Sequence, residues 1–201
     1  MKTTALILSC LTLQHFAHAE PEPLTNGQAY LAATLAAFST PKMKEAPIKV
    51  DAAIRKATGL QEDSGAKAII AIPDGGIAEL KLAELASGTL PLCRLWLKGY
   101  ALILPESKKA SVEKMDVDAE GETHRVNIWL LGVRKSDKGN PELIVCANQK
   151  EPVMVLPLTS LDTPAPADPD GPVRVGVQIE DRRTWLVLSM LGTHEAKLEI
   201  E

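Results

Sequence analysis

Residues 173–180, near the C-terminus, read VRVGVQIE. Valine or isoleucine occupies every second position, and charged residues, glutamine or glycine lie between them. This alternation is typical of a β-strand with one buried face. Residues 196–200 alternate in the same way, and 185–191 form another apolar strand. The C-terminal part of the chain therefore predicts antiparallel strands.

Similar segments precede this stretch and are separated by short turns that contain Gly, Pro, Asn or Asp. The turn at 136–141, for example, reads SDKGNP. About eight short strands joined by tight turns are typical of a mainly antiparallel β-sandwich or barrel. The predicted upstream strands are 66–72, 90–104, 115–119, 126–133, 143–147 and 153–158. Residues 90–104 are expected to form a strand pair or one long strand bent at Gly99.

Two short helices are expected before the strands, which makes the predicted fold class α+β. Residues 27–40 are rich in alanine, and Thr25 or Asn26 is suited to cap the first amides. A second helix is predicted at 50–58, because Gly59 follows it as a helix end requires. The first helix is expected to bury one stripe of side chains, namely Tyr30, Leu31, Leu35 and Phe38.

The first nineteen residues, MKTTALILSCLTLQHFAHA, have the features of a signal peptide. Lys2 is followed by a short apolar run, and Ala17 and Ala19 form a small-x-small cleavage signature. We therefore expect cleavage after Ala19 and export to the periplasm or the extracellular space. A lipid anchor at Cys10 is the alternative. The apolar run is too short to span a bilayer, so no transmembrane segment is expected.

The remaining chain divides by composition into two parts. Residues 20–62 are expected to form a helical segment packed on the main domain, and residues 63–201 a β-rich domain. The proline-rich stretch 162–172 resembles a linker. Too few residues follow it to form an independent core, so we interpret it as a loop on the β-rich domain.

Charge and composition argue against a nucleic-acid partner. The chain has 22 Lys and Arg against 26 Asp and Glu, and only 3% of its residues are aromatic. A mildly acidic chain without a dense basic run offers no footprint for nucleic acid. The expected partner is an unidentified protein or other component of the cell envelope, and the sequence does not indicate the oligomeric state.

Cys93 and Cys146 are the two cysteines that remain after cleavage. Export favours a disulfide between them, whereas their apolar surroundings also suit free cysteines that fill a core. The spacing does not decide between these interpretations. Neither cysteine belongs to a CxxC motif, so a redox or nucleophilic role is not expected.

Acidic residues at Asp116, Asp118 and Glu120 precede Gly121 in a spacing that partly matches a calcium loop. The twelfth position of that loop, where a bidentate Glu closes the site, is Asn127. We therefore interpret the segment as an exposed strand leading into a turn, and expect no metal site or cofactor.

Enzyme signatures are missing from the sequence. His124 and His194 are too far apart for a standard zinc motif, and the nucleophile-elbow, P-loop and dinucleotide motifs do not occur. Two acidic residues could still meet in space as a hydrolase pair. No catalytic residue is assigned.

Three tryptophans, Trp96, Trp129 and Trp185, are candidates for a ligand platform. On exposed strand faces they would stack against sugars, but each lies among Leu, Ile or Val, as core tryptophans do. The sequence thus favours an exported, non-enzymatic binding or accessory module. A carbohydrate-binding domain is the first alternative, and a carboxylate-pair hydrolase the second.

Overall fold

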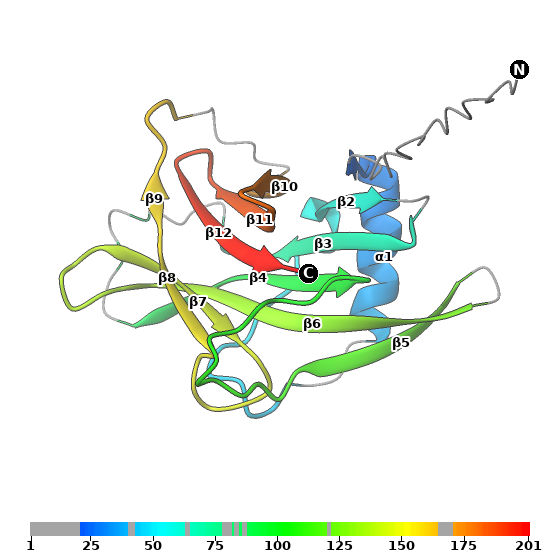
Figure 1. The fold of residues 1–201 in the computed structure, drawn as a ribbon, viewed down its shortest axis with the longest axis horizontal. Helices are drawn as coiled ribbons and strands as arrows, with labels where there is room; N and C mark the ends of the chain where they lie inside the picture. Colours follow the sequence, from blue (N-terminus) through cyan, green and yellow to red (C-terminus); the bar gives the residue numbers. More distant parts are fainter. Residues whose placement is uncertain are drawn as a thin grey trace, which may run out of the picture.

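A computed structural model of the chain describes most of residues 21–201 (Figure 1). The predicted signal peptide, residues 1–19, lies outside the described part. The residues described are 21–39, 43–62, 65–77, 82, 85, 88–119, 122–164 and 171–201.

The larger sheet is antiparallel and contains eight strands within the described residues. Seven of them follow one another across the sheet, and β5 pairs with the first half of the long strand β6, on the same edge as β7. In spatial order the seven are β1 (Glu22–Pro23), β2 (Thr58–Glu62), β3 (Lys67–Pro73), β4 (Thr89–Lys98), β6 (Glu122–Lys135), β7 (Pro141–Cys146) and β8 (Met154–Pro157), and β5 is Glu113–Ala119.

The smaller sheet is also antiparallel and has four strands in the described part of the chain. Its first strand is the alternating segment that predicted a β fold, and this prediction is confirmed. The hairpin partner of that strand is β11, whose Leu188 lies opposite Val175. In spatial order the strands are β10 (Val173–Glu180), β11 (Arg183–Met190), β12 (His194–Ile200) and β9 (Thr159–Ser160).

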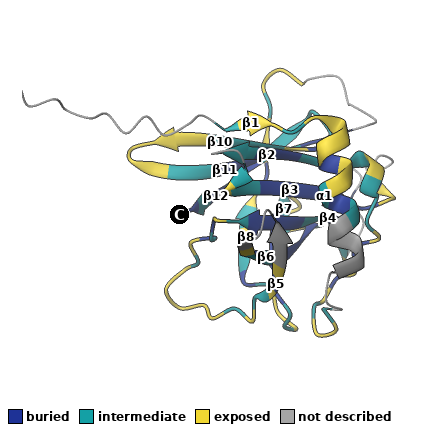
Figure 2. Ribbon diagram, turned by 90° about the vertical axis from the view of Figure 1, so that its right-hand side faces the viewer, coloured by how far each residue is buried: buried dark blue, intermediate teal, exposed yellow. Residues whose placement is uncertain are grey.

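The two sheets share one hydrophobic core, an arrangement consistent with a β-sandwich. Alternate residues of each central strand point into it, as the pleat requires. Figure 2 shows the central strands of the larger sheet as the most buried part of the molecule. The core includes Ile69, Leu95, Leu97, Trp129 and Leu131 from the larger sheet, and Leu186, Leu188, Leu198 and Ile200 from the smaller one.

A left-handed glycine ends β4 and sends the chain from one sheet to the other. Gly99 has a φ of 69°, a conformation that other residues rarely adopt. Beyond it, the amides of Ala101 and Ile103 donate to the carbonyls of Glu201 and Glu199 at 2.9 Å. The predicted strand 90–104 is therefore two segments, and the second pairs with the C-terminal strand of the smaller sheet.

One α-helix, α1 (Asn26–Ser39), lies across the outer face of the larger sheet (Figure 1). Its N-terminus carries a capping box. The backbone N–H of Gln28 donates to Thr25 Oγ1, and the N–H of Thr25 donates to Gln28 Oε1 at 2.9 Å. Ala29 and Ala33 are buried against the sheet. The predicted first helix is present and begins at the predicted cap.

The predicted buried stripe of this helix is wrong at its N-terminal end. Tyr30 is 42% exposed and Leu31 is 63% exposed, whereas the small residues Ala29 and Ala33 face the sheet. Figure 2 shows exposed residues along this part of α1. The side chains of Leu35 and Phe38 lie outside the described part. Because Ala29 and Ala33 are small, the helix packs closely on the sheet. Leu31 lies at the side of this interface and stays largely exposed.

The prediction of a second helix at 50–58 is wrong, and with it the predicted α+β class with two N-terminal helices. The described part of the chain is mostly β, with one α-helix. Only one short 3-10 turn, Ile54–Lys56, forms at 50–58, and the chain then enters β2. Tertiary hydrogen bonds hold the backbone extended, since the Asp51 N–H donates to Asp74 Oδ2 at 2.8 Å and the Ala53 N–H to the Pro73 carbonyl at 2.8 Å.

Gly59, which was expected to end that helix, lies inside β2. A Cβ at this position would lie 2.7 Å from the Ile69 carbonyl oxygen and 2.8 Å from Leu24 Cδ1. The glycine therefore serves close packing in a strand. In the described part of the chain, no helix is both long and apolar enough to cross a membrane.

Candidate functional site

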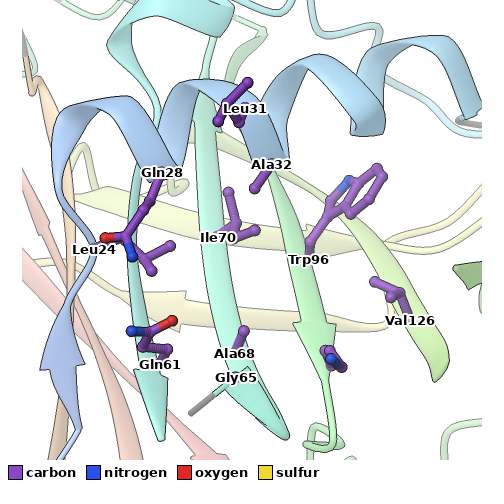
Figure 3. A pocket seen from close by; sticks show the side chains of 11 residues that line it. Leu24, Gln28, Leu31, Ala32, Gln61, Gly65, Ala68, Ile70, Trp96 and Val126 are labelled. Carbon is purple, nitrogen blue, oxygen red and sulfur yellow. The ribbon is translucent and has the colours of Figure 1, made fainter. Parts of the chain in front are cut away.

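An apolar groove lies between α1 and the outer face of the larger sheet (Figure 3). It has a volume of about 320 Å³ and is open on one side. Ligand sites are typically concave, mostly apolar and equipped with a few polar groups, and this groove fits that description. Its lining residues are Leu24, Gln28, Leu31, Ala32, Gln61, Gly65, Ala68, Ile70, Trp96, Lys98 and Val126.

The floor of the groove is set by the register of the sheet. Ala68, Lys98 and Val126 lie in one cross-strand row, and Ile70 and Trp96 lie in the next. These residues have the parity that points away from the shared core of the two sheets. The floor therefore belongs to paired central strands, which hold its side chains in fixed positions.

The roof is formed by the start of α1 and the residues before it. Leu24 packs close to Gly59, and its amide donates to the Gly59 carbonyl at 2.9 Å. Gln28, Leu31 and Ala32 follow along the helix, and Figure 3 shows them above Ile70 and Trp96. The capping box fixes where the helix begins, and so fixes the roof relative to the floor.

Polar groups along the groove face of β4 are all hydrogen-bond donors. Trp96 lines the groove, and its Nε1 is buried without a hydrogen-bond partner. Arg94 lies two residues earlier on the same face, and its Nε is also buried and unpartnered. Burial lowers the pKa of the Arg94 guanidinium from its ordinary value. Lys98 lies two residues after Trp96 and lines the groove.

The three tryptophans do not form one platform. Trp96 is 4% exposed and packs in the layer below α1, whereas Trp129 is 2% exposed and lies in the core between the sheets. Trp185 is half-buried on β11. They belong to three different surfaces of the sheets, and only Trp96 lines the apolar groove.

Trp185 lines a second hollow beside the smaller sheet, with a volume of about 530 Å³. This hollow is more open and more polar, because Lys108, Lys197 and Glu199 contribute to it. Lys197 donates to Glu180 at 2.8 Å, so its charge is already paired. The groove under α1 is therefore the better candidate for an apolar ligand.

Cys93 and Cys146 are both free and buried. Cys93 points into the core between the sheets, whereas Cys146 contacts Ile48 and Val50 on the outer face. Burial raises the pKa of the Cys93 thiol, and it raises that of Cys146 to about 11. Both thiols are therefore protonated at neutral pH and poorly reactive.

Among the described residues, Asp116 belongs to no cluster of metal ligands. It pairs with Arg125 Nε across the β5–β6 hairpin at 3.1 Å. The side chain of Asp118 and all of Glu120 lie outside the described part. Within that part, no three His, Cys, Asp or Glu side chains come together as a metal site would require.

His194 begins β12 and contacts two hydroxyl groups. Its Nε2 lies 3.2 Å from Ser160 Oγ, and its Nδ1 lies 3.0 Å from Thr193 Oγ1. The Thr193 hydroxyl in turn lies 3.5 Å from the Met190 carbonyl. Desolvation lowers the pKa of His194 below its ordinary value. The sequence did not indicate this contact, because Ser160 is far from His194 along the chain.

Arg94 and Lys98 were not expected from the sequence to be functional residues. The alternation in residues 92–98, LCRLWLK, could have indicated them. Arg94, Trp96 and Lys98 occupy every second position and therefore lie on one face of the strand. That pattern marks the outer face of the strand, but only the position of α1 shows that the face lines a groove.

Fold and groove together define the class: a mostly β protein of two antiparallel sheets, with an apolar groove under its helix. The chain matches no known family, no curated protein and no solved structure in the comparisons.

Proposed function

We propose that this protein is an exported, non-enzymatic binding module, and that the groove under α1 holds its ligand. The observation that supports this most is the exposure of a large apolar side chain at a formed concavity. Leu31 is 63% exposed at the groove, whereas the floor residues Ile70 and Val126 are buried. A large apolar side chain left exposed at a concavity is typical of a binding site.

The construction of the groove supports a small molecule as its occupant. Its volume of about 320 Å³ lies at the lower end of the range for small-molecule sites. Its floor is paired strand and its roof is a capped helix, so the site exists before the ligand arrives. Preformed sites lose little conformational entropy on binding.

A fluorescent apolar probe, N-phenyl-1-naphthylamine, tests this proposal. We expect saturable binding, seen as increased probe emission and energy transfer from tryptophan. Ala68→Leu and Ala32→Leu each add three carbon atoms to the groove lining. Each should weaken binding by about tenfold or more, because the added side chain fills the space.

The matched control is Gln178→Leu, which adds a leucine at an exposed position of β10 in the other sheet. It should bind the probe like the wild type. Thermal melting of each variant separates loss of binding from loss of folding. Unchanged binding in both folded groove variants would contradict the proposal.

Export is the second part of the proposal and rests on the signal features of residues 1–19. We expect the mature protein to begin at Glu20 when the full chain is expressed in a bacterium with an envelope. The intact mass of protein from the periplasmic fraction measures this. A lipidated N-terminus at Cys10, or an uncleaved chain, would contradict it.

A further inference from the structure

We propose that the ligand is a single-chain amphiphile with a carboxylate, whose acid group pairs with Lys98 and whose chain lies along the floor toward Trp96. This inference rests on the proposed function and names its ligand class. It comes from the charge and the donor inventory of the groove.

The charge at the groove is positive. Lys98 lies in one cross-strand row with Ala68 and Val126, so apolar side chains flank its stem on both neighbouring strands. None of the described residues that line the groove is acidic. The Lys98 ammonium makes no ion pair or hydrogen bond within the described part of the chain. An anionic group is the complementary partner for it.

The other polar atoms favour a ligand that accepts hydrogen bonds. Gln28 Oε1 is already occupied, since it accepts from the N–H and the hydroxyl of Thr25 at 2.9 and 3.0 Å. Gln61 lines the groove as well, and its amide N–H₂ group is a donor. A carboxylate has acceptors only, so it suits both Gln61 and Lys98.

The positions of the polar and apolar lining residues indicate how the ligand lies in the groove. Gln61 and Ala68 lie at the end of the groove near Gly65, whereas Ile70 and Ala32 continue toward Trp96 (Figure 3). Lys98 belongs to the first end, because it is the cross-strand partner of Ala68. An acid group at the Lys98 end therefore places an alkyl chain on apolar residues. The volume of about 320 Å³ suits one chain of medium length, and a two-chain lipid would exceed it.

Displacement of bound N-phenyl-1-naphthylamine by dodecanoate and by dodecanol tests the inference. The two molecules have the same chain and differ in the charge of the head group. We expect dodecanoate to bind about fivefold more tightly than dodecanol, with the difference shrinking at high salt. Both are used below their critical micelle concentrations or solubility limits.

Lys98→Met should abolish this preference by weakening dodecanoate binding, whereas Lys98→Arg should keep it. The control Lys138→Met removes an exposed lysine from the β6–β7 turn and should change nothing. Equal affinity for the two ligands, or a preference that survives in Lys98→Met, would overturn the inference and leave the proposed function standing. Failure of the wild type to bind the probe would instead overturn the proposed function.

Discussion

Cys93 and Cys146 lie on opposite faces of the same sheet, with β6 between their strands. Cys93 of β4 is opposite Leu131 of β6, and Leu130, the neighbour of Leu131, is opposite Cys146 of β7. Two strand spacings separate β4 from β7 by roughly 9.6 Å. A disulfide needs Cα atoms within about 7 Å and side chains that point toward each other. The structure therefore favours the alternative of two free, core-filling cysteines.

The first prediction concerns these two thiols in protein that begins at Glu20 and therefore lacks Cys10. The folded protein should react very slowly with a thiol reagent, because burial raises the pKa of both groups. Unfolding without a reducing agent should expose two reactive thiols per chain, and reductant should not change the melting temperature. Fewer than one thiol per chain after unfolding would show that a bridge forms and that the strand arrangement given above is wrong.

The second prediction tests the shared core with two matched isoleucines. Ile69 is 0% exposed between the sheets, and Ile179 is 68% exposed on β10. Ile69→Ala should reduce the free energy of unfolding by about 2–5 kcal/mol, because it leaves a cavity. Ile179→Ala should change it by about 0.5 kcal/mol or less. Urea unfolding measures both, and similar losses would place the core elsewhere.

The third prediction compares two glycines with positive φ. Gly99 and Gly139 have φ values of 69° and 83°. A Cβ at Gly139 would meet nothing within 4 Å, whereas one at Gly99 would lie 2.8 Å from Lys67 Cγ and 3.1 Å from the Ala66 carbonyl oxygen. Both alanine variants bear the cost of a left-handed backbone.

In Gly99→Ala, the new Cβ also comes too close to Lys67 and Ala66, which adds a steric cost to the backbone strain. This variant should therefore lose about 1 kcal/mol or more of stability beyond the loss in Gly139→Ala. Chemical unfolding of the two variants side by side gives the difference. Equal losses would mean that the crossover at Gly99 is not tightly packed against the β2–β3 connection.

The fourth prediction is a pH dependence that depends on His194. Desolvation lowers its pKa in the folded state, so the unfolded chain binds the proton more readily. Its contribution to stability is complete above the unfolded pKa of about 6.5 and is lost as the pH falls toward the folded value. Stability should thus fall between pH 7.5 and 5.5.

His194→Gln removes the titrating group and keeps a polar side chain beside Ser160. The fall in the free energy of unfolding should be smaller in this variant, while the carboxylates contribute equally to both proteins. Urea titrations at the two pH values measure the difference. An identical fall in wild type and variant would exclude His194 as its source.

Local patterns predicted much of the fold. Period-two alternation found β10 and β12, and the capping residue Thr25 with an alanine-rich run found α1. The helix expected at 50–58 does not form, because the Asp51 N–H donates to the side chain of Asp74, which lies in a turn distant along the chain. A pattern confined to neighbouring residues contains no information on such a contact.

The candidate site was less predictable for the same reason. Trp96 was singled out from the sequence, yet its role depends on the position of α1 over β3 and β4. That position follows from Ala29 and Ala33 in the buried interface, where the larger Tyr30 and Leu31 were expected. Helical periodicity favoured the bulky stripe, but close packing on the sheet selected the small one.

The most direct test of the central claim is a map of backbone amide shifts in isotope-labelled mature protein as N-phenyl-1-naphthylamine is added. The groove predicts saturable shifts at residues 24–32, 61–70 and 96–98 and at Val126, with little change elsewhere. Shifts confined to residues 103–108 and 152–156, which line the second hollow, would contradict the account, as would the absence of any saturable shift.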